Sequence, residues 1–128
     1  MQHHIEYDPE ARILIGTISD TATLEGFRDY FDALDGHPDM SQCIGVISDG
    51  HSLDMSSFPG SDIRPMLADA LTHNERWRGK ARAMVVSRDM EYGMGRMYQI
   101  IGDEDLSYPT QLCYSLEEAR AWIVNPES

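Results

Sequence analysis

The chain has 128 residues, of which 41% are hydrophobic and 25% are charged, a composition that is ordinary for one globular domain with a single core. Its net charge is −12, and residues 1–62 hold twelve acidic and two basic residues, whereas residues 63–128 hold ten and eight. This balance opposes nonspecific nucleic-acid binding, and a solvated acidic surface accounts for it without a basic partner.

The sequence also bears on compartment and partners. Cys43 and Cys113 each lie in an apolar run, and no CxxC or paired Cys/His spacing suggests a disulfide framework or a zinc site. The N-terminus lacks the pattern of a signal peptide, and no apolar run approaches the ~20 residues of a membrane span. The basic segment at residues 76–82 includes Trp77, which could stack on a nucleobase. We disfavour that role because the chain as a whole is strongly acidic. We therefore expect a cytoplasmic protein with reduced thiols, no nucleic-acid partner and no integral membrane association.

The chain is predicted to begin with an antiparallel hairpin. The first strand covers residues 5–7, and Asp8 and Pro9 then suit a type I turn. The second strand covers residues 12–19, where Gly16 either weakens the strand slightly or allows a bulge.

The next predicted elements are a helix and a central strand. Thr21 or Thr23 caps the helix, and Gly36 ends it. Its apolar stripe comprises Leu24, Phe27, Tyr30, Phe31 and Leu34. The strand over residues 42–48 is continuously apolar, as expected for a strand covered on both faces. We predict a loop over residues 49–60, and its length is typical of functional loops.

A second helix is predicted between a cap at Ser61 or Asp62 and an end at Gly79, with Pro65 tolerated in its first turn. Basic residues near its end complement the helix dipole. The predicted buried face comprises Ile63, Met66, Leu67, Ala70, Leu71 and Trp77.

The last third of the chain reads as strand, helix, strand and helix. The strands are predicted over residues 83–86 and 111–114, and the helix between them over residues 90–101. Ser115 and Glu118 form a capping box ahead of the final helix, in which each side chain satisfies an amide of the first turn. The whole chain, residues 1–128, is thus predicted to be one α/β domain of about five mostly parallel strands and about four helices.

The loop after the third predicted strand holds the first candidate site. Asp49, His51 and Asp54 follow a central strand, where ligands of open α/β sheets bind, and these side chains could ligate a metal or perform acid–base chemistry. The alternative is a turn in which the aspartates accept hydrogen bonds from local amides and His51 is merely exposed. We favour the alternative.

Ser56 and Ser57 form a second candidate in the same loop. Serines just ahead of a helix serve as caps, as anion ligands or as phosphorylation sites. Capping is the commonest of these roles. The chain has no GxSxG motif that would make a serine the nucleophile of a hydrolase.

Tyr92 and Arg96 are a third candidate for contact with a ligand or partner. Gly93 and Gly95 lie beside them and lower helix propensity, which suggests close approach of another backbone or a ligand. No dinucleotide or P-loop fingerprint is present. The second half of the chain is also rich in methionine, which fills cores but also lines adaptable pockets. These methionines are Met66, Met84, Met90, Met94 and Met97.

The order of elements and the segments at residues 83–98 and 116–123 resemble the STAS domain, the fold of the anti-sigma-factor antagonists. More specifically, the chain is similar to the bacterial SpoIIAA-like family. In anti-sigma-factor antagonists, a serine of an Asp-Ser-Ser-Gly motif after a central strand is phosphorylated and switches partner binding. The resemblance implies that Ser56 or Ser57 has this role, although Met55 interrupts the motif here.

The resemblance and the lack of a catalytic set together favour a non-enzymatic regulatory or binding domain that acts through protein contacts and forms homo-oligomers, such as a homodimer. One alternative is a protein that binds a small apolar ligand or a lipid, as the related CRAL-TRIO domains do. A second alternative is a small hydrolase or metal enzyme that uses the loop after the third strand. We assign no catalytic residue, metal ligand or cofactor.

Overall fold

The computed structural model describes residues 1–73, 75–87 and 109–126. The strands are β1 (Gln2–Asp8), β2 (Ile13–Thr21), β3 (Gly45–Asp54), β4 (Ala81–Val85) and β5 (Thr110–Cys113); the helices are α1 (Leu24–Asp35), the short 3-10 helix η1 (Gly60–Asp62), α2 (Ile63–Thr72) and α4 (Leu116–Val124). The strands form one mixed sheet in the order β1-β2-β3-β4-β5, in which β1 and β2 are antiparallel and the other neighbours are parallel. The predicted α/β class and N-terminal hairpin are confirmed.

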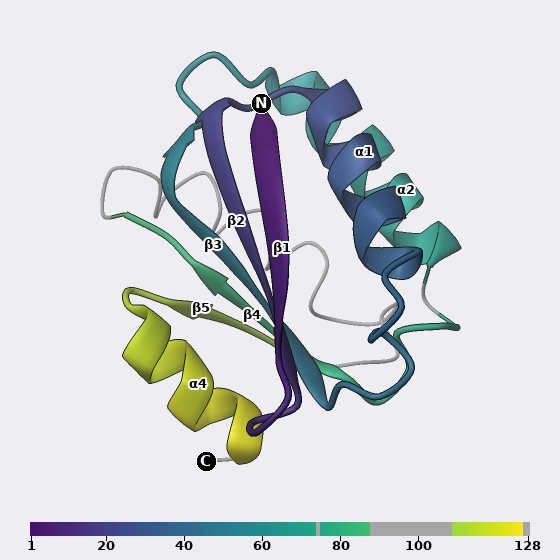
Figure 1. Ribbon diagram of the computed structural model, residues 1–128. Helices are drawn as coiled ribbons and strands as arrows, with labels where there is room; N and C mark the ends of the chain where they lie inside the picture. Colours follow the sequence, from purple (N-terminus) through teal and green to yellow (C-terminus); the bar gives the residue numbers. More distant parts are fainter. Residues whose placement is uncertain (74, 88–108, 127–128) are drawn as a thin grey trace.

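The helices cover both faces of the sheet. Figure 1 shows α1 and α2 together on one face and α4 on the opposite face. The core under α1 and α2 includes Leu14, Ile18, Phe27, Tyr30, Leu34, Val46, Met66, Trp77 and Met84. The core under α4 comprises Ile13, Ile47, Ala81, Ala83, Val85, Cys113, Ala119 and Ile123. Successive strand residues alternate between these two cores because strand side chains point to opposite faces.

Local capping signals explain where the helices begin. Thr23, not Thr21, caps α1, and its hydroxyl oxygen accepts a hydrogen bond from the amide of Gly26 at 2.9 Å. Ser115 caps α4 in the same way through the amide of Glu118 at 3.1 Å. The Glu118 carboxylate accepts from the amide of Tyr114, one residue before the cap, so the reciprocal half of the predicted capping box is displaced by one residue.

The third strand is longer than predicted. β3 continues through the first half of the segment that we predicted as a loop, because β2 also extends to Thr21 and offers it backbone partners. The pairing shifts on the way: Thr17 pairs with Asp49 and Ser19 with Ser52, so β3 holds one extra residue in a bulge. Gly16 pairs with Ser48 and lies outside this bulge, so of the two alternatives given for this glycine the bulge does not occur.

The second helix is shorter than predicted. α2 ends at Thr72 with His73 as its C-cap, and Gly79, at φ 75°, belongs to a later turn before β4. Trp77 is buried as predicted but lies in the turns after the helix. The described residues hold three α-helices and one short 3-10 helix, and the helix predicted over residues 90–101 lies outside them.

Candidate functional site

The structure separates the three residues of the first candidate site along β3. Asp49 and Asp54 are five residues apart on an extended strand, which corresponds to roughly 16 Å at 3.3 Å per residue. A shared metal ion requires ligand atoms within about 2.5 Å of it, so these two carboxylates cannot hold one ion together. Within the described residues, no group of three His, Cys, Asp or Glu side chains is placed to bind a metal.

Both carboxylates accept hydrogen bonds from nearby amides. Oδ1 of Asp49 accepts from the amide of His51 at 3.1 Å, beside the bulge, and Oδ1 of Asp54 accepts from the amide of Ser56 at 2.9 Å. Hydrogen bonds from the Ser56 hydroxyl and amide hold the pKa of Asp54 below its usual value, so this exposed carboxylate is ionised at neutral pH. His51 is exposed. The local amide bonds agree with the alternative that we favoured, but these residues lie in β3 and not in the turn that this alternative assumed.

Ser56 and Ser57 are both exposed in a short loop with anchors on either side. On one side, the Asp54 carboxylate accepts from the Ser56 amide, and the Asp54 carbonyl accepts from the Ala22 amide at 2.8 Å. On the other side, Phe58 packs edge-on against Phe27 of α1, with 5.6 Å between ring centroids. The loop is thus fixed at both ends, and the two serines lie between the fixed points.

Tyr92 and Arg96 lie outside the described residues, as do Met90, Met94 and Met97. The two other methionines of that group, Met66 and Met84, are buried in the core under α1 and α2. These two side chains therefore contribute to the core.

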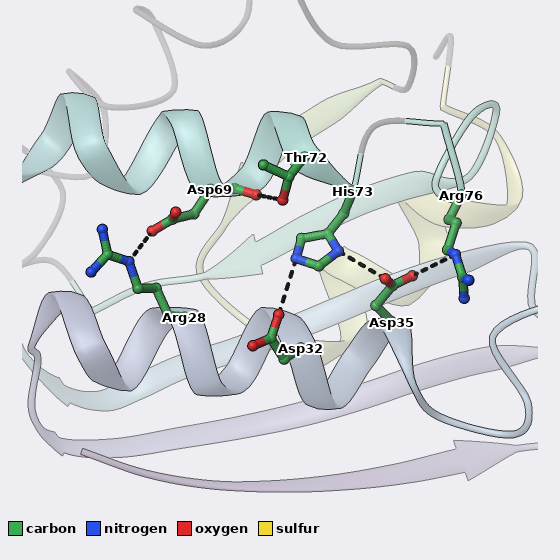
Figure 2. A network of polar contacts seen from close by, with 7 residues as sticks. All are labelled: Arg28, Asp32, Asp35, Asp69, Thr72, His73 and Arg76. Atoms are coloured by element: carbon green, nitrogen blue, oxygen red, sulfur yellow. Dashed lines mark hydrogen bonds and ion pairs between the residues drawn. The ribbon is translucent and has the colours of Figure 1, made fainter.

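A polar network between α1 and α2, shown in Figure 2, was not predicted from the sequence. His73 lies at its centre, with Nδ1 2.9 Å from Oδ2 of Asp35 and Nε2 3.4 Å from Oδ1 of Asp32. The second carboxylate oxygen of Asp35, Oδ1, is buried without a hydrogen bond and lies 3.7 Å from Nε of Arg76. One turn away, Nε of Arg28 on α1 donates to Asp69 on α2 at 2.6 Å.

An aromatic and cationic stack continues from this network into the core. The ring of His73 stacks on Trp77, with 4.9 Å between centroids, and the guanidinium of Arg82 lies 4.2 Å from the centroid of the Trp77 ring. Phe31 meets Trp77 edge-on at 5.9 Å. Arg82 is 8% exposed, so its charge is desolvated and the contacts of the stack are stronger than they would be in water.

A pocket of about 280 Å³ lies beside the network, at the C-terminal end of α1. It is lined by Asp35, His37, Pro38, Met40, Ser41 and Arg76. The Arg76 side chain is 71% exposed, whereas the Asp35 side chain is 19% exposed, so Arg76 forms the solvent-facing part of this charged wall and Asp35 the buried part. The lining thus combines ionisable side chains with the apolar Pro38 and Met40.

The chemistry available to these groups is limited. Among the described residues, no serine, threonine or cysteine side chain is hydrogen-bonded to a histidine, which is one pairing that activates a nucleophile. Both nitrogens of His73 face carboxylates, and the Thr72 hydroxyl donates to the Asp69 carbonyl at 2.6 Å. The network is therefore suited to joining α1 to α2.

No sequence signal marked this network, because its members come from two helices that are about 40 residues apart and meet only after folding, as His73 and Asp35 do at a separation of 38. Comparisons of the chain with protein-family models, curated proteins and solved structures found no match. None of the helices in the described ranges has both the length and the apolar character needed to cross a membrane.

Proposed function

We propose that this protein is a non-enzymatic regulatory domain that acts by binding another protein, and that the loop carrying Ser56 and Ser57 is its switchable contact. The geometry of that loop is the observation that carries the proposal. Two exposed hydroxyls lie between a carboxylate anchor and an aromatic anchor. They follow the C-terminal end of β3 and precede α2, the position that the resemblance to anti-sigma-factor antagonists assigns to a phosphorylated serine.

A phosphate would act differently on the two serines. It adds a charge of about −1.5 to −2 at neutral pH. The Ser56 amide donates to the Asp54 carboxylate at 2.9 Å and the Ser56 side chain lowers the pKa of that carboxyl, so a phosphate on Ser56 would place like charges together and open the turn between these residues. A phosphate on Ser57 would add charge without removing that bond. Ser56 is thus the position where phosphorylation changes the shape of the loop as well as its charge.

The first test is to map phosphate on the protein purified from its own cells, by intact mass and by peptide mapping. Partners captured by cross-linking are then identified, and the binding of a purified partner is measured with the variants Ser56→Asp and Ser57→Asp. Ser61→Asp is the matched control, because Ser61 is exposed and lies in η1 beyond the Phe58 anchor. We expect Ser56→Asp to change partner affinity by about tenfold or more, and the control to change it little.

Two results would contradict the proposal. One is an unphosphorylated loop together with partner binding that is the same for wild type, Ser56→Asp and Ser57→Asp. The other is an enzymatic turnover that is lost specifically on Asp49→Ala or His51→Ala, which would make β3 the site of a reaction.

A further inference from the structure

β1 is an edge strand whose outer side has no partner among the described strands. It pairs with β2 over seven consecutive residues, from Gln2 to Asp8, without a shift in register. Its outer side therefore presents an unbroken row of alternating amide and carbonyl groups, which can pair with another strand.

Several of the features that usually protect such an edge are missing from β1, although it carries the charged side chains of Glu6 and Asp8. Proteins block edge strands with proline, lysine, bulges or a charge that points inward. β1 has the sequence QHHIEYD, with no proline or lysine, and its register with β2 contains no bulge. The inward-facing positions on the α1 side hold Ile5 and Tyr7, which pack against the core. An edge of this kind is open to pairing.

We propose that the partner of this edge is β1 of a second copy of the chain, paired antiparallel about a two-fold axis at Ile5. In this register Ile5 faces its own copy, His4 faces Glu6 of the second copy and Glu6 faces His4 of the second copy. His3 faces Tyr7 of the second copy on the helix side of the sheet. The two five-stranded sheets then join into one continuous sheet.

Charge selects this register among the alternatives. A two-fold axis perpendicular to the sheet keeps each side chain on its own face, so the axis must pass through a residue and cannot lie between two. An axis at His4 would place two histidines opposite each other, and an axis at Glu6 would place two glutamates opposite each other, which is repulsive. With the axis at Ile5, every residue of β1 also lies opposite a residue of β1 in the second copy.

The His4 and Glu6 side chains are well placed for this contact. Within one chain, Nε2 of His4 lies 2.9 Å from Oε1 of Glu6, and the two side chains are 70% and 73% exposed. Directly opposite residues of paired strands are about 5 Å apart. Two copies would therefore bring two imidazoles and two carboxylates into one alternating cluster. The inference is independent of the proposed function, because it does not involve the Ser56–Ser57 loop.

The test exchanges the His4 and Glu6 side chains in the full-length chain. Self-association is measured by sedimentation velocity and native mass spectrometry at low salt. His4→Glu places glutamates opposite each other, and Glu6→His places histidines opposite each other. Each single variant is expected to weaken self-association by about tenfold or more. An equimolar mixture of the two variants restores both His–Glu pairs across the interface, so it should form a heterodimer as tight as the wild-type dimer. The double variant His4→Glu/Glu6→His should also dimerise.

His51→Glu is the control, since it makes the same histidine-to-glutamate substitution at an exposed position on β3, away from β1. It should leave the dimer unchanged, and circular dichroism should show that every variant is folded. A wild-type chain that stays monomeric at its highest soluble concentration would overturn the proposal. A dimer that is indifferent to both single variants, or a mixture that does not recover, would overturn the assigned strand and register.

Discussion

Gly16 is the residue whose identity is most tightly constrained by its surroundings on β2. A Cβ atom at this position would lie 2.1 Å from Oη and 2.6 Å from Cε1 of Tyr30. Tyr30 cannot move away easily, because it is 1% exposed and its hydroxyl is hydrogen-bonded to the buried Ser48 hydroxyl at 2.7 Å. The glycine is therefore required by a close approach of α1 to the sheet, and not by the backbone conformation.

We predict that Gly16→Ala lowers the free energy of unfolding by about 1–3 kcal/mol, because the added methyl group overpacks the core. Gly60→Ala is the matched control, since a Cβ at Gly60 meets nothing within 4 Å. It should change stability by less than about 1 kcal/mol. Urea unfolding of both variants measures the difference. Equal stability of the two variants would mean that Tyr30 is free to shift.

The pairing of α1 with α2 depends on His73. Its ring is held by hydrogen bonding to Asp35 on one edge and by stacking on Trp77 across one face. A second contact between the two helices, from Arg28 to Asp69, is more exposed. The Arg28 side chain is 51% exposed, whereas the His73 side chain is 12% exposed. Burial strengthens a hydrogen bond, so the His73 contact contributes more to the pairing of these helices.

We predict that His73→Ala lowers the free energy of unfolding by about 1.5–3 kcal/mol, because it leaves the half-buried Asp35 carboxylate without its hydrogen bond. Arg78→Ala is the control. It removes an exposed ion pair with Glu75 in the turns that follow α2, and its effect should be much smaller. Thermal and urea unfolding measure both. If the two variants unfold alike, His73 does not join the helices.

At the scale of the whole molecule, several acidic groups are buried in their neutral form. Burial raises the pKa of the Cys113 thiol to about 11, with a smaller contribution from the Glu118 carboxylate. Burial likewise raises the pKa of Cys43, against the nearby Lys80 charge, and that of Tyr30, against the charge of Arg82. All three groups keep their protons longer in the folded chain than in the unfolded chain.

These raised pKa values make the free energy of unfolding depend on pH in the alkaline range. Above the ordinary thiol pKa of 9.0, the unfolded chain loses the protons of Cys43 and Cys113 while the folded chain keeps them. The folded state then binds more protons than the unfolded state. Stability is therefore full below pH 9.0 and falls as the pH rises toward about 11. Urea unfolding at a series of alkaline pH values measures this fall. Replacing both cysteines by alanine should make the fall smaller, with the contribution of Tyr30 remaining, and a variant profile as steep as that of the wild type would contradict the assignment of the fall to the thiols.

Particular residues show which element boundaries could be predicted from the sequence and which could not. The caps at Thr23 and Ser115 depend on contacts within four residues, and the sequence predicted both helix starts. The segment after Ser48 was misassigned because Gly, Ser and Asp are typical of loops. It is a strand only because β2 lies beside it and pairs with it as far as Asp54. The end of α2 was placed too late for a similar reason: Trp77 fits the helical period but packs from a turn.

The sequence by itself determined the α/β class, the N-terminal hairpin, the starts of α1 and α4 and the apolar setting of both cysteines, because each depends on local periodicity or on contacts between near neighbours. Only the tertiary structure decided which polar groups meet. His73 and Asp35, Arg28 and Asp69, and Arg120 and Asp8 are separated by 38, 41 and 112 residues. Such pairs form when packed elements bring their side chains together, and no spacing along the chain encodes that geometry.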